Sequence, residues 1–385
     1  MDLALTVRNT FVQHFHGEPV VVRSPGRINL IGEHTDYNDG LVLPAAIDKA
    51  VYVAVHKNNS NLVRLVSQEY NDQVEVGLTE LVPSSSKPWT NYILGVVNQF
   101  QKRNFTVTGF NLVIGGDVPL GAGLSSSAAV ECATAYALNE IFSFGLSRLE
   151  LVKLAQLAEH EFAGVKCGIM DQFASVFGKP NHVIKLDCRS LEYVYVPFDL
   201  SGYKIVLFDS RVKHSLALTA YNKRREECES GVQLIQRQYP DVKSLRDVTL
   251  SQVEECIKPV DLTIFKRCAY VVEEISRVEQ ACEALNSNDL DTFGKLMFQT
   301  HEGLSQAYEV SCAELDFLIN EAKKFPAVIG ARMMGGGFGG CTINLIAGAE
   351  MKRATDLVTL SYQNQFTVTP GVYQVTPSAG TAVIV

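Results

Sequence analysis

The stretch Pro119-Leu-Gly-Ala-Gly-Leu-Ser-Ser-Ser-Ala128 follows a strand-like segment at 110–114 and runs into a helical pattern at 126–141. Its two glycines let the backbone approach a ligand closely. Its three serines place hydroxyls and free N–H groups at a helix N-terminus, where the helix dipole favours an anion. The pattern predicts a phosphate-binding turn; the alternative is an ordinary strand-to-helix turn capped by serine. It is not a Walker A loop, because no G-K-[ST] follows, and Ser126 replaces the third glycine of a dinucleotide fingerprint.

Around this turn, strand-like and helical segments are mixed without regular alternation, which favours an α+β fold over a doubly wound sheet. Strands are expected at 19–23, 41–47, 51–56, 62–67, 73–76, 110–114, 183–186, 193–196 and 204–208, and helices at 3–15, 90–101, 126–141 and 147–162. The later half is mainly helical, at 215–238, 262–286, 289–308 and 312–324, and closes with a glycine-rich strand region at 329–347, a helix and a strand. A turn near 197–202 predicts a first domain over 1–198 and a second over 199–385.

Two other stretches carry unusual chemistry. The predicted loop 24–40 holds Arg27, Glu33, His34 and Asp36 inside an otherwise apolar region. Such carboxylates can accept hydrogen bonds from sugar hydroxyls, and an arginine can stabilise a transferring phosphoryl group. Solvated loop charges are the alternative, and Asp171 in Met170-Asp-Gln172 could be only a helix-start carboxylate.

The glycine-rich run 335–340 formally matches G-x-G-x-x-G, but the strand-like Cys341-Thr-Ile-Asn-Leu-Ile346 follows it where a dinucleotide site needs a helix. Five glycines in six residues predict either close packing of this backbone against a ligand or the other domain, or a tight β-turn.

Composition excludes several classes of protein. The net charge of −8 gives no general attraction to nucleic acid or to an anionic membrane. No apolar run reaches the length of a membrane-spanning helix, and no signal peptide is evident. The nine cysteines include no C-x-x-C pair and are expected to be free thiols in the cytoplasm.

The stretch Ser24-Pro-Gly-Arg-Ile-Asn-Leu-Ile-Gly-Glu-His-Thr-Asp-Tyr-Asn38 resembles the signature of the galactokinase family. The serine-rich turn resembles the ATP motif of the wider superfamily of homoserine, mevalonate and phosphomevalonate kinases, and 332–341 resembles its third motif. The resemblance implies a ribosomal-protein-S5-like α+β domain followed by a ferredoxin-like domain, with the active site in the cleft between them. It implies phosphorylation of the C1 hydroxyl of α-D-galactose by ATP, in a monomer with small-molecule substrates.

The resemblance also implies roles for individual residues. Asp171 and Arg27 would be catalytic, with Asp171 acting either as a general base or as an orienting group for the hydroxyl. The sugar would be bound by Glu33, His34, Thr35, Asp36 and Tyr221. ATP would be bound by Ser67, Gly121, Ala122, Gly123, Leu124, Ser125, Ser126 and Ser127, with Trp89 beside the adenine. Mg²⁺ would be held by Ser127 and Glu159, because it prefers hard oxygen ligands and keeps several waters.

Alternatives of other classes remain at this stage. One is a galactose and ATP sensor without catalysis, although such relatives typically alter the Ser-Ala end of the ATP motif, which is intact at 127–128. Another is a kinase for N-acetylgalactosamine, arabinose or galacturonate, and a third is nucleotide binding without chemistry. Met334 departs from the family pattern, in which many relatives have a threonine, and so removes a hydroxyl from the third motif.

Overall fold

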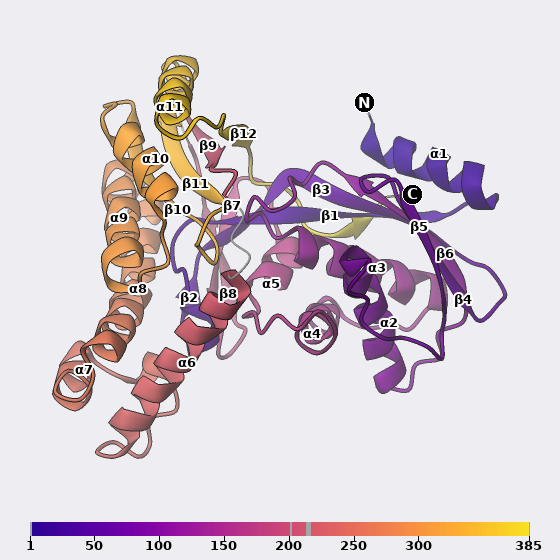
Figure 1. Ribbon diagram of the computed structural model, residues 1–385, viewed down its shortest axis with the longest axis horizontal. Coiled ribbons are helices and arrows are strands. Elements are labelled where there is room, and N and C mark those ends of the chain that lie inside the picture. Colours follow the sequence, from indigo (N-terminus) through magenta and orange to yellow (C-terminus); the bar gives the residue numbers. More distant parts are fainter. Residues whose placement is uncertain (1, 201, 213–216, 385) are drawn as a thin grey trace.

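The computed structural model describes residues 2–200, 202–212 and 217–384 and contains three sheets (Figure 1). The first is six-stranded, in the order β13-β1-β3-β6-β4-β5, and only its β4–β6 pair is parallel. Its strands are β1 (Val20–Asn29), β3 (Pro44–Lys57), β4 (Leu62–Ser67), β5 (Asp72–Gly77), β6 (Phe110–Gly116) and β13 (Ala382–Val383).

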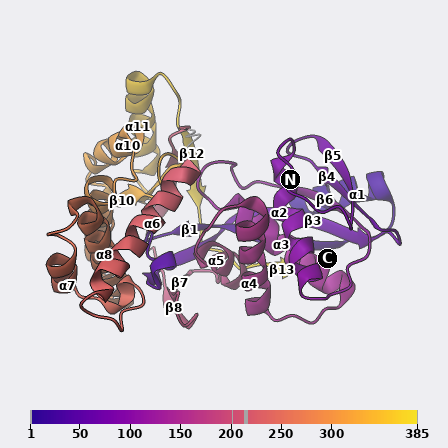
Figure 2. The ribbon, with the colours of Figure 1, turned by 60° about the horizontal axis from the view of Figure 1, so that its bottom comes forward.

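Helices cover both faces of this sheet, because successive side chains along its strands point to opposite faces and both faces are apolar. Val21 packs with Val7 and Phe11 of α1 (Leu3–Phe15) on one face, whereas Val22 joins the main hydrophobic cluster on the other. That second face carries α2 (Asn91–Lys102), α3 (Ser126–Phe142), α4 (Arg148–Ala158) and α5 (Met170–Phe177) (Figure 2).

The second large sheet has the antiparallel order β10-β11-β9-β12. Its strands are β9 (Tyr203–Asp209), β10 (Val328–Met333), β11 (Cys341–Ala347) and β12 (Gly371–Val375). Val206 and Phe208 pack on α10 (Ala313–Lys323) and α11 (Met351–Phe366), while Ile205 and Leu207 join the main cluster, which includes Phe293 of α9 (Leu290–Glu302). This cluster draws residues from both halves of the chain, so the halves share one core.

The remaining elements lie around these two sheets. A small third sheet has the order β2-β7-β8, and the helices α6, α7 and α8 lie in the half that holds β9 to β12 (Figure 1). Their bounds are β2 (Leu41–Val42), β7 (His182–Asp187), β8 (Tyr193–Pro197), α6 (Ala217–Gln236), α7 (Leu250–Cys256) and α8 (Leu262–Asn286). The first two residues of the helix predicted at 215–238 lie outside the described residues.

The α+β class and the two-part organisation are confirmed, but two local predictions are wrong. The loop predicted at 24–40 begins later, because β1 continues to Asn29 through a bulge between Pro25 and Arg27. The strands predicted at 41–47 and 51–56 are β2 and one long strand, β3, in which Asp48 and Lys49 occupy accessible positions and form no turn. The helix predicted at 289–308 is confirmed, because α9 continues directly into a π turn at Gly303–Ala307.

The C-terminal strand crosses the predicted domain boundary. Arg23 in β1 pairs with Ala382 in β13, and the Ser24 and Thr381 hydroxyls lie 2.8 Å apart in the interior. Residues 382–383 therefore complete the first sheet, although the division at 198/199 assigns them to the second half. Among the described residues no helix is long and apolar enough to cross a membrane, and the nine cysteines are free thiols.

Candidate active site

The serine-rich turn between β6 and α3 borders a cavity of about 240 Å³. Gly121 and Gly123 have positive φ angles of 73° and 74°, a left-handed backbone conformation that residues with a side chain rarely adopt. The predicted ATP residues Ser67, Gly121, Ser126 and Ser127 line the cavity, and so does Trp89, stacked on Tyr70. Ala122 and Leu124 instead bury their side chains and anchor the turn in the core.

The glycine-rich loop between β10 and β11 lies against this turn. A Cβ on Gly340 would come within 3.6 Å of the Ala122 carbonyl oxygen, and one on Gly335 within 3.6 Å of the Gly123 oxygen. At Gly337, with φ of 82°, a Cβ would lie 2.1 Å from the Val310 oxygen, which excludes any side chain. Of the two interpretations of this run, close backbone packing against another part of the chain is confirmed.

A second cavity of about 150 Å³ brings together residues from both halves of the chain. Its lining comprises Arg27, Glu33, His34, Asp36, Glu159, Val165, Cys167, Met170, Asp171, Tyr221, Gly335 and Gly336. Thus four of the five predicted sugar residues and both predicted catalytic residues meet in one place. Thr35 is the exception, because its buried hydroxyl donates to the carbonyls of Gly32 and Leu41 and so closes the loop.

Arg27 and Asp171 form a two-pronged ion pair in this cavity. Arg27 Nε donates to Asp171 Oδ1 and Nη2 donates to Oδ2, each at 2.8 Å. The third nitrogen, Nη1, donates to the Gly123 carbonyl at 2.6 Å, and the Ser125 hydroxyl donates to Asp171 Oδ2. The β1 bulge just before Arg27 redirects its side chain. Arg27 therefore joins the serine-rich turn to the second cavity.

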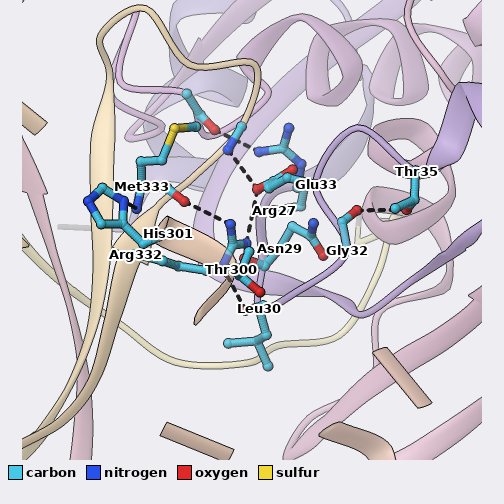
Figure 3. Close-up of polar contacts among 12 residues, drawn as sticks. Arg27, Asn29, Leu30, Gly32, Glu33, Thr35, Thr300, His301, Arg332 and Met333 are labelled. Carbon is cyan, nitrogen blue, oxygen red and sulfur yellow. Dashed lines mark hydrogen bonds and ion pairs between the residues drawn. The ribbon is translucent and has the colours of Figure 1, made fainter. Parts of the chain in front are cut away.

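Glu33 is fixed by the glycine-rich strand pair. Its Oε1 accepts hydrogen bonds from Arg332 Nη2 at 3.0 Å and from the Gly335 N–H at 2.7 Å (Figure 3). Arg332 is wholly buried, and it also donates to the carbonyls of Asn29, Leu30 and Met333. Burial alone would raise the pKa of Glu33, but the charges of Arg332 and Arg27 outweigh it and hold that pKa below its usual value.

Helix α8 holds the same loop from a second direction. Glu274 is fully buried and accepts from the Gly32 N–H at 2.8 Å and from the Thr300 hydroxyl at 3.0 Å. The Tyr270 hydroxyl donates to the Glu33 carbonyl at 3.1 Å. Residues of the second half therefore set the position of the loop that carries Glu33, His34 and Asp36.

Burial and charge perturb two further groups in the second cavity. Burial, with the nearby Asp171 charge, raises the pKa of Asp36 to about 7. Burial lowers the pKa of His34 to about 4, so the ring is neutral at pH 7. Among the described residues no hydrogen-bond partner meets its buried Nε2 in full geometry, while the Gly336 backbone beside the ring partly offsets the fall in pKa. Orphaned polar atoms of this kind are uncommon in protein interiors, and a ligand hydroxyl could satisfy this one.

The two cavities meet at Glu159 and Ser127. Glu159, at the start of a π turn (Glu159–Ala163), lines the second cavity and hydrogen bonds to Ser127, which lines the first. Burial and the Asp171 charge raise its pKa, and the buried Glu131 shares the Gln172 amide with it. Crowded carboxylates beside a hydroxyl fit a cation with hard oxygen ligands. No group of three or more His, Cys, Asp or Glu side chains is placed to hold a metal within the described ranges.

Comparison with known proteins gives the family. The galactokinase galactose-binding signature matches residues 9–57, and the N- and C-terminal domains of GHMP kinases match 91–179 and 281–354. A galactokinase of Thermotoga petrophila is 44% identical over 359 residues, covering 93% of this chain and 98% of that protein. The chain belongs to the galactokinase family. It is therefore a sugar kinase, a phosphotransferase with an alcohol acceptor, and ATP is its co-substrate.

Other relatives agree with this assignment. A galactokinase of Roseiflexus is 40% identical over 375 residues, covering 97% of this chain and 95% of that one. The crystal structure of Lactococcus lactis galactokinase complexed with galactose superposes with a TM-score of 0.95 at 33% identity, covering 99% and 100% of the two chains. The mevalonate kinase of Methanococcus jannaschii, at 18% identity and a TM-score of 0.67 over 94% of this chain and 99% of that one, shares the fold.

Sequence reasoning missed three residues that shape the galactokinase-type site. Arg332 is the first residue of the third motif at 332–341, but only the structure shows that it is buried and bonded to Glu33. Glu274 lies in an ordinary helical pattern, and no local signal distinguishes it. Gly168 lacks a side chain because a Cβ there would lie 1.8 Å from Asp36 Oδ2. Met334, the departure from the family pattern, packs in the core and lines neither cavity.

Proposed function

We propose that this chain transfers the γ-phosphoryl group of ATP to the C1 hydroxyl of α-D-galactose, giving galactose 1-phosphate and ADP. The observation that carries the proposal is the Arg27–Asp171 pair, which lies in the second cavity and is bonded directly to the serine-rich turn. The second cavity would hold the sugar and the first would hold the nucleotide. The transferred group would then pass between them at Arg27.

In this reaction the O–P bond to ADP breaks and a C1–O–P bond forms, while the C1 hydroxyl loses its proton. The Asp171 carboxylate accepts three hydrogen bonds, two from Arg27 and one from Ser125. These donors fix its plane and leave Oδ1 with acceptor capacity for the C1 hydroxyl. Asp171 therefore orients the hydroxyl and accepts its proton late, as suits a loose phosphoryl-transfer transition state.

The remaining lining residues bind the sugar and the nucleotide. Glu33, Asp36 and the neutral His34 present hydrogen-bonding atoms to sugar hydroxyls, and the Tyr221 ring closes the cavity against Gly336. Ser126 and the N–H groups of the turn hold phosphate oxygens. Ser127 and Glu159 would hold Mg²⁺, which supplies charge neutralisation to the phosphates when bound.

A coupled ADP-release assay with ATP and Mg²⁺ tests the proposal. The acceptors are galactose, N-acetylgalactosamine, glucose, arabinose, galacturonate and no sugar. Fast turnover confined to galactose, with the phosphate on C1, is the expected result. Turnover of N-acetylgalactosamine in its place would change the substrate, and silence with clear calorimetric binding of galactose would indicate a sensor.

A further inference from the structure

A chain of buried polar side chains leads away from the second cavity behind His34. His34 Nδ1 lies 2.7 Å from the Tyr37 hydroxyl, which lies 2.8 Å from the Tyr308 hydroxyl. The Tyr308 hydroxyl lies 3.2 Å from the sulfur of Cys228. We call these four residues the His34 relay. Only His34 lines the cavity, so the other three can reach a ligand only through it.

The relay is rigid as well as continuous. The rings of His34 and Tyr308 pack with centroids 4.9 Å apart, and Tyr308 and Cys228 are almost wholly buried. Arg224 holds the Tyr308 backbone by donating from Nε to its carbonyl at 2.7 Å. At the open end of the relay, His34 Nε2 is buried and no described residue meets it in full hydrogen-bond geometry, although the Gly336 backbone contacts the ring.

Counting protons leaves two possible directions for the relay. The neutral ring carries one hydrogen, on Nδ1 or on Nε2, and each hydroxyl or thiol also carries one. In one direction Cys228 donates to Tyr308, Tyr308 donates to Tyr37, and Tyr37 donates to His34 Nδ1. In the other direction every bond is reversed, and His34 Nε2 bears no hydrogen.

The acceptor strength at the His34 end favours the first direction. At the far end, the one hydrogen of the Cys228 thiol can point at the Tyr308 oxygen, which lies 3.2 Å from the sulfur. At the other end, an unprotonated imidazole nitrogen is a better acceptor for a phenol than a phenol oxygen is for an imidazole N–H.

We propose that the His34 relay fixes the Nε2–H tautomer of His34 and so presents a hydrogen-bond donor to one hydroxyl oxygen of the sugar. Tyr37, Tyr308 and Cys228 are then positioning residues for sugar recognition. The identity of the ligand rests on the proposed function, but the tautomer does not, because it belongs to the protein without sugar.

Nitrogen NMR of ¹⁵N-histidine-labelled protein tests the tautomer directly. The chain has eight histidines, and the His34 signals are those that disappear in His34→Gln. We expect an unprotonated Nδ1 and a protonated Nε2 in the sugar-free protein. A protonated Nδ1 would overturn the proposal whether or not the protein phosphorylates galactose.

Galactose titration calorimetry tests the consequence for binding. Loss of one net hydrogen bond predicts that Tyr37→Phe raises the Kd for galactose on the order of tenfold. Tyr308→Phe should produce a smaller rise with the same sign, because it removes only the donor to Tyr37. The KM for ATP should stay unchanged in both variants.

Tyr362→Phe is the matched control, because the buried Tyr362 hydroxyl donates to the Ser210 carbonyl and neither residue lines either cavity. It should leave the Kd for galactose unchanged. Wild-type affinity in both Tyr37→Phe and Tyr308→Phe would refute the relay. A wild-type protein that binds no galactose would instead refute the proposed function, and the NMR result would still decide the tautomer.

Discussion

Gly168→Ala should disable sugar binding without touching any residue that lines the nucleotide cavity. A Cβ at this position would lie 1.8 Å from Oδ2, 2.1 Å from Cγ and 2.8 Å from Cβ of Asp36. Gly168 does not have a positive φ, so alanine carries no backbone penalty of its own. The overlap must therefore be relieved by moving Asp36 away from the sugar.

The expected magnitude follows from the hydrogen bonds that Asp36 would lose. A hydrogen bond to a charged group contributes about 1.5–3 kcal/mol. The Kd for galactose should therefore rise about 10- to 150-fold, measured by titration calorimetry. The KM for ATP should change less than twofold.

Two comparisons isolate the cause. In an Asp36→Gly background the three atoms nearest to the new Cβ are absent, so adding Gly168→Ala should not weaken galactose binding further. Gly77→Ala is the matched control, since its Cβ would meet Glu80 at an ordinary 3.5 Å. A Gly168→Ala protein that binds galactose within twofold of wild type would refute the steric argument.

Four further substitutions test the site. Asp171→Asn should lower kcat by at least about 100-fold in single-turnover phosphoryl transfer, and a kcat within threefold of wild type would remove Asp171 from the chemistry. Asp36→Asn should stabilise the protein against urea at pH 8 by up to about 4 kcal/mol, the value of a shift of about three pKa units. Because the pKa of Asp36 is raised to about 7, the folded state binds one more proton than the unfolded state between about pH 4 and 7, and wild-type stability falls as the pH rises through this range. The stability gained by Asp36→Asn should therefore vanish near pH 4. An equal gain in stability at pH 4 and at pH 8 would contradict this explanation. Arg332→Met should reduce the free energy of unfolding by about 3–5 kcal/mol, because it leaves Glu33 buried without its partner, and unchanged urea unfolding would show that the pair is dispensable. Glu159→Gln should raise the Mg²⁺ concentration needed for half-maximal activity and weaken Mn²⁺ binding measured by electron paramagnetic resonance, whereas unchanged Mn²⁺ binding would exclude Glu159 as a ligand.

Sequence patterns correctly predicted the helices and strands that are determined by their own neighbouring residues. The helix at 3–15 and the strand at 62–67 have the predicted bounds, and a capping box of Ser147 and Glu150 starts the helix that was predicted from 147. The extension of β1 to Asn29 was missed because Pro25 and Gly26 are typical of a turn. In this sheet they occupy a bulge, where a missing N–H and a missing side chain are tolerated.

The residues that line the site were more predictable from the sequence than the residues that hold its loop in position. Glu33, His34, Asp36 and Asp171 were named from quoted sequence stretches and Tyr221 from the family resemblance alone, and all of them line one cavity. Arg332 and Glu274 hold the backbone of residues 29–33 across more than 240 positions in the sequence. Only the packing of the two halves brings such distant groups together, and no local periodicity encodes that packing.

The pairing of β13 with β1 has a consequence for synthesis on the ribosome. The strand at 20–29 is translated long before its outer neighbour at 382–383, because every residue between the two strands must be added first. Until then β1 presents unpaired backbone groups along that edge, and an exposed strand edge is a template for aggregation. A nascent chain therefore carries a vulnerable edge while all the residues between β1 and β13 are translated. Chaperone demand should accordingly fall once residues 382–383 clear the exit tunnel and pair with β1.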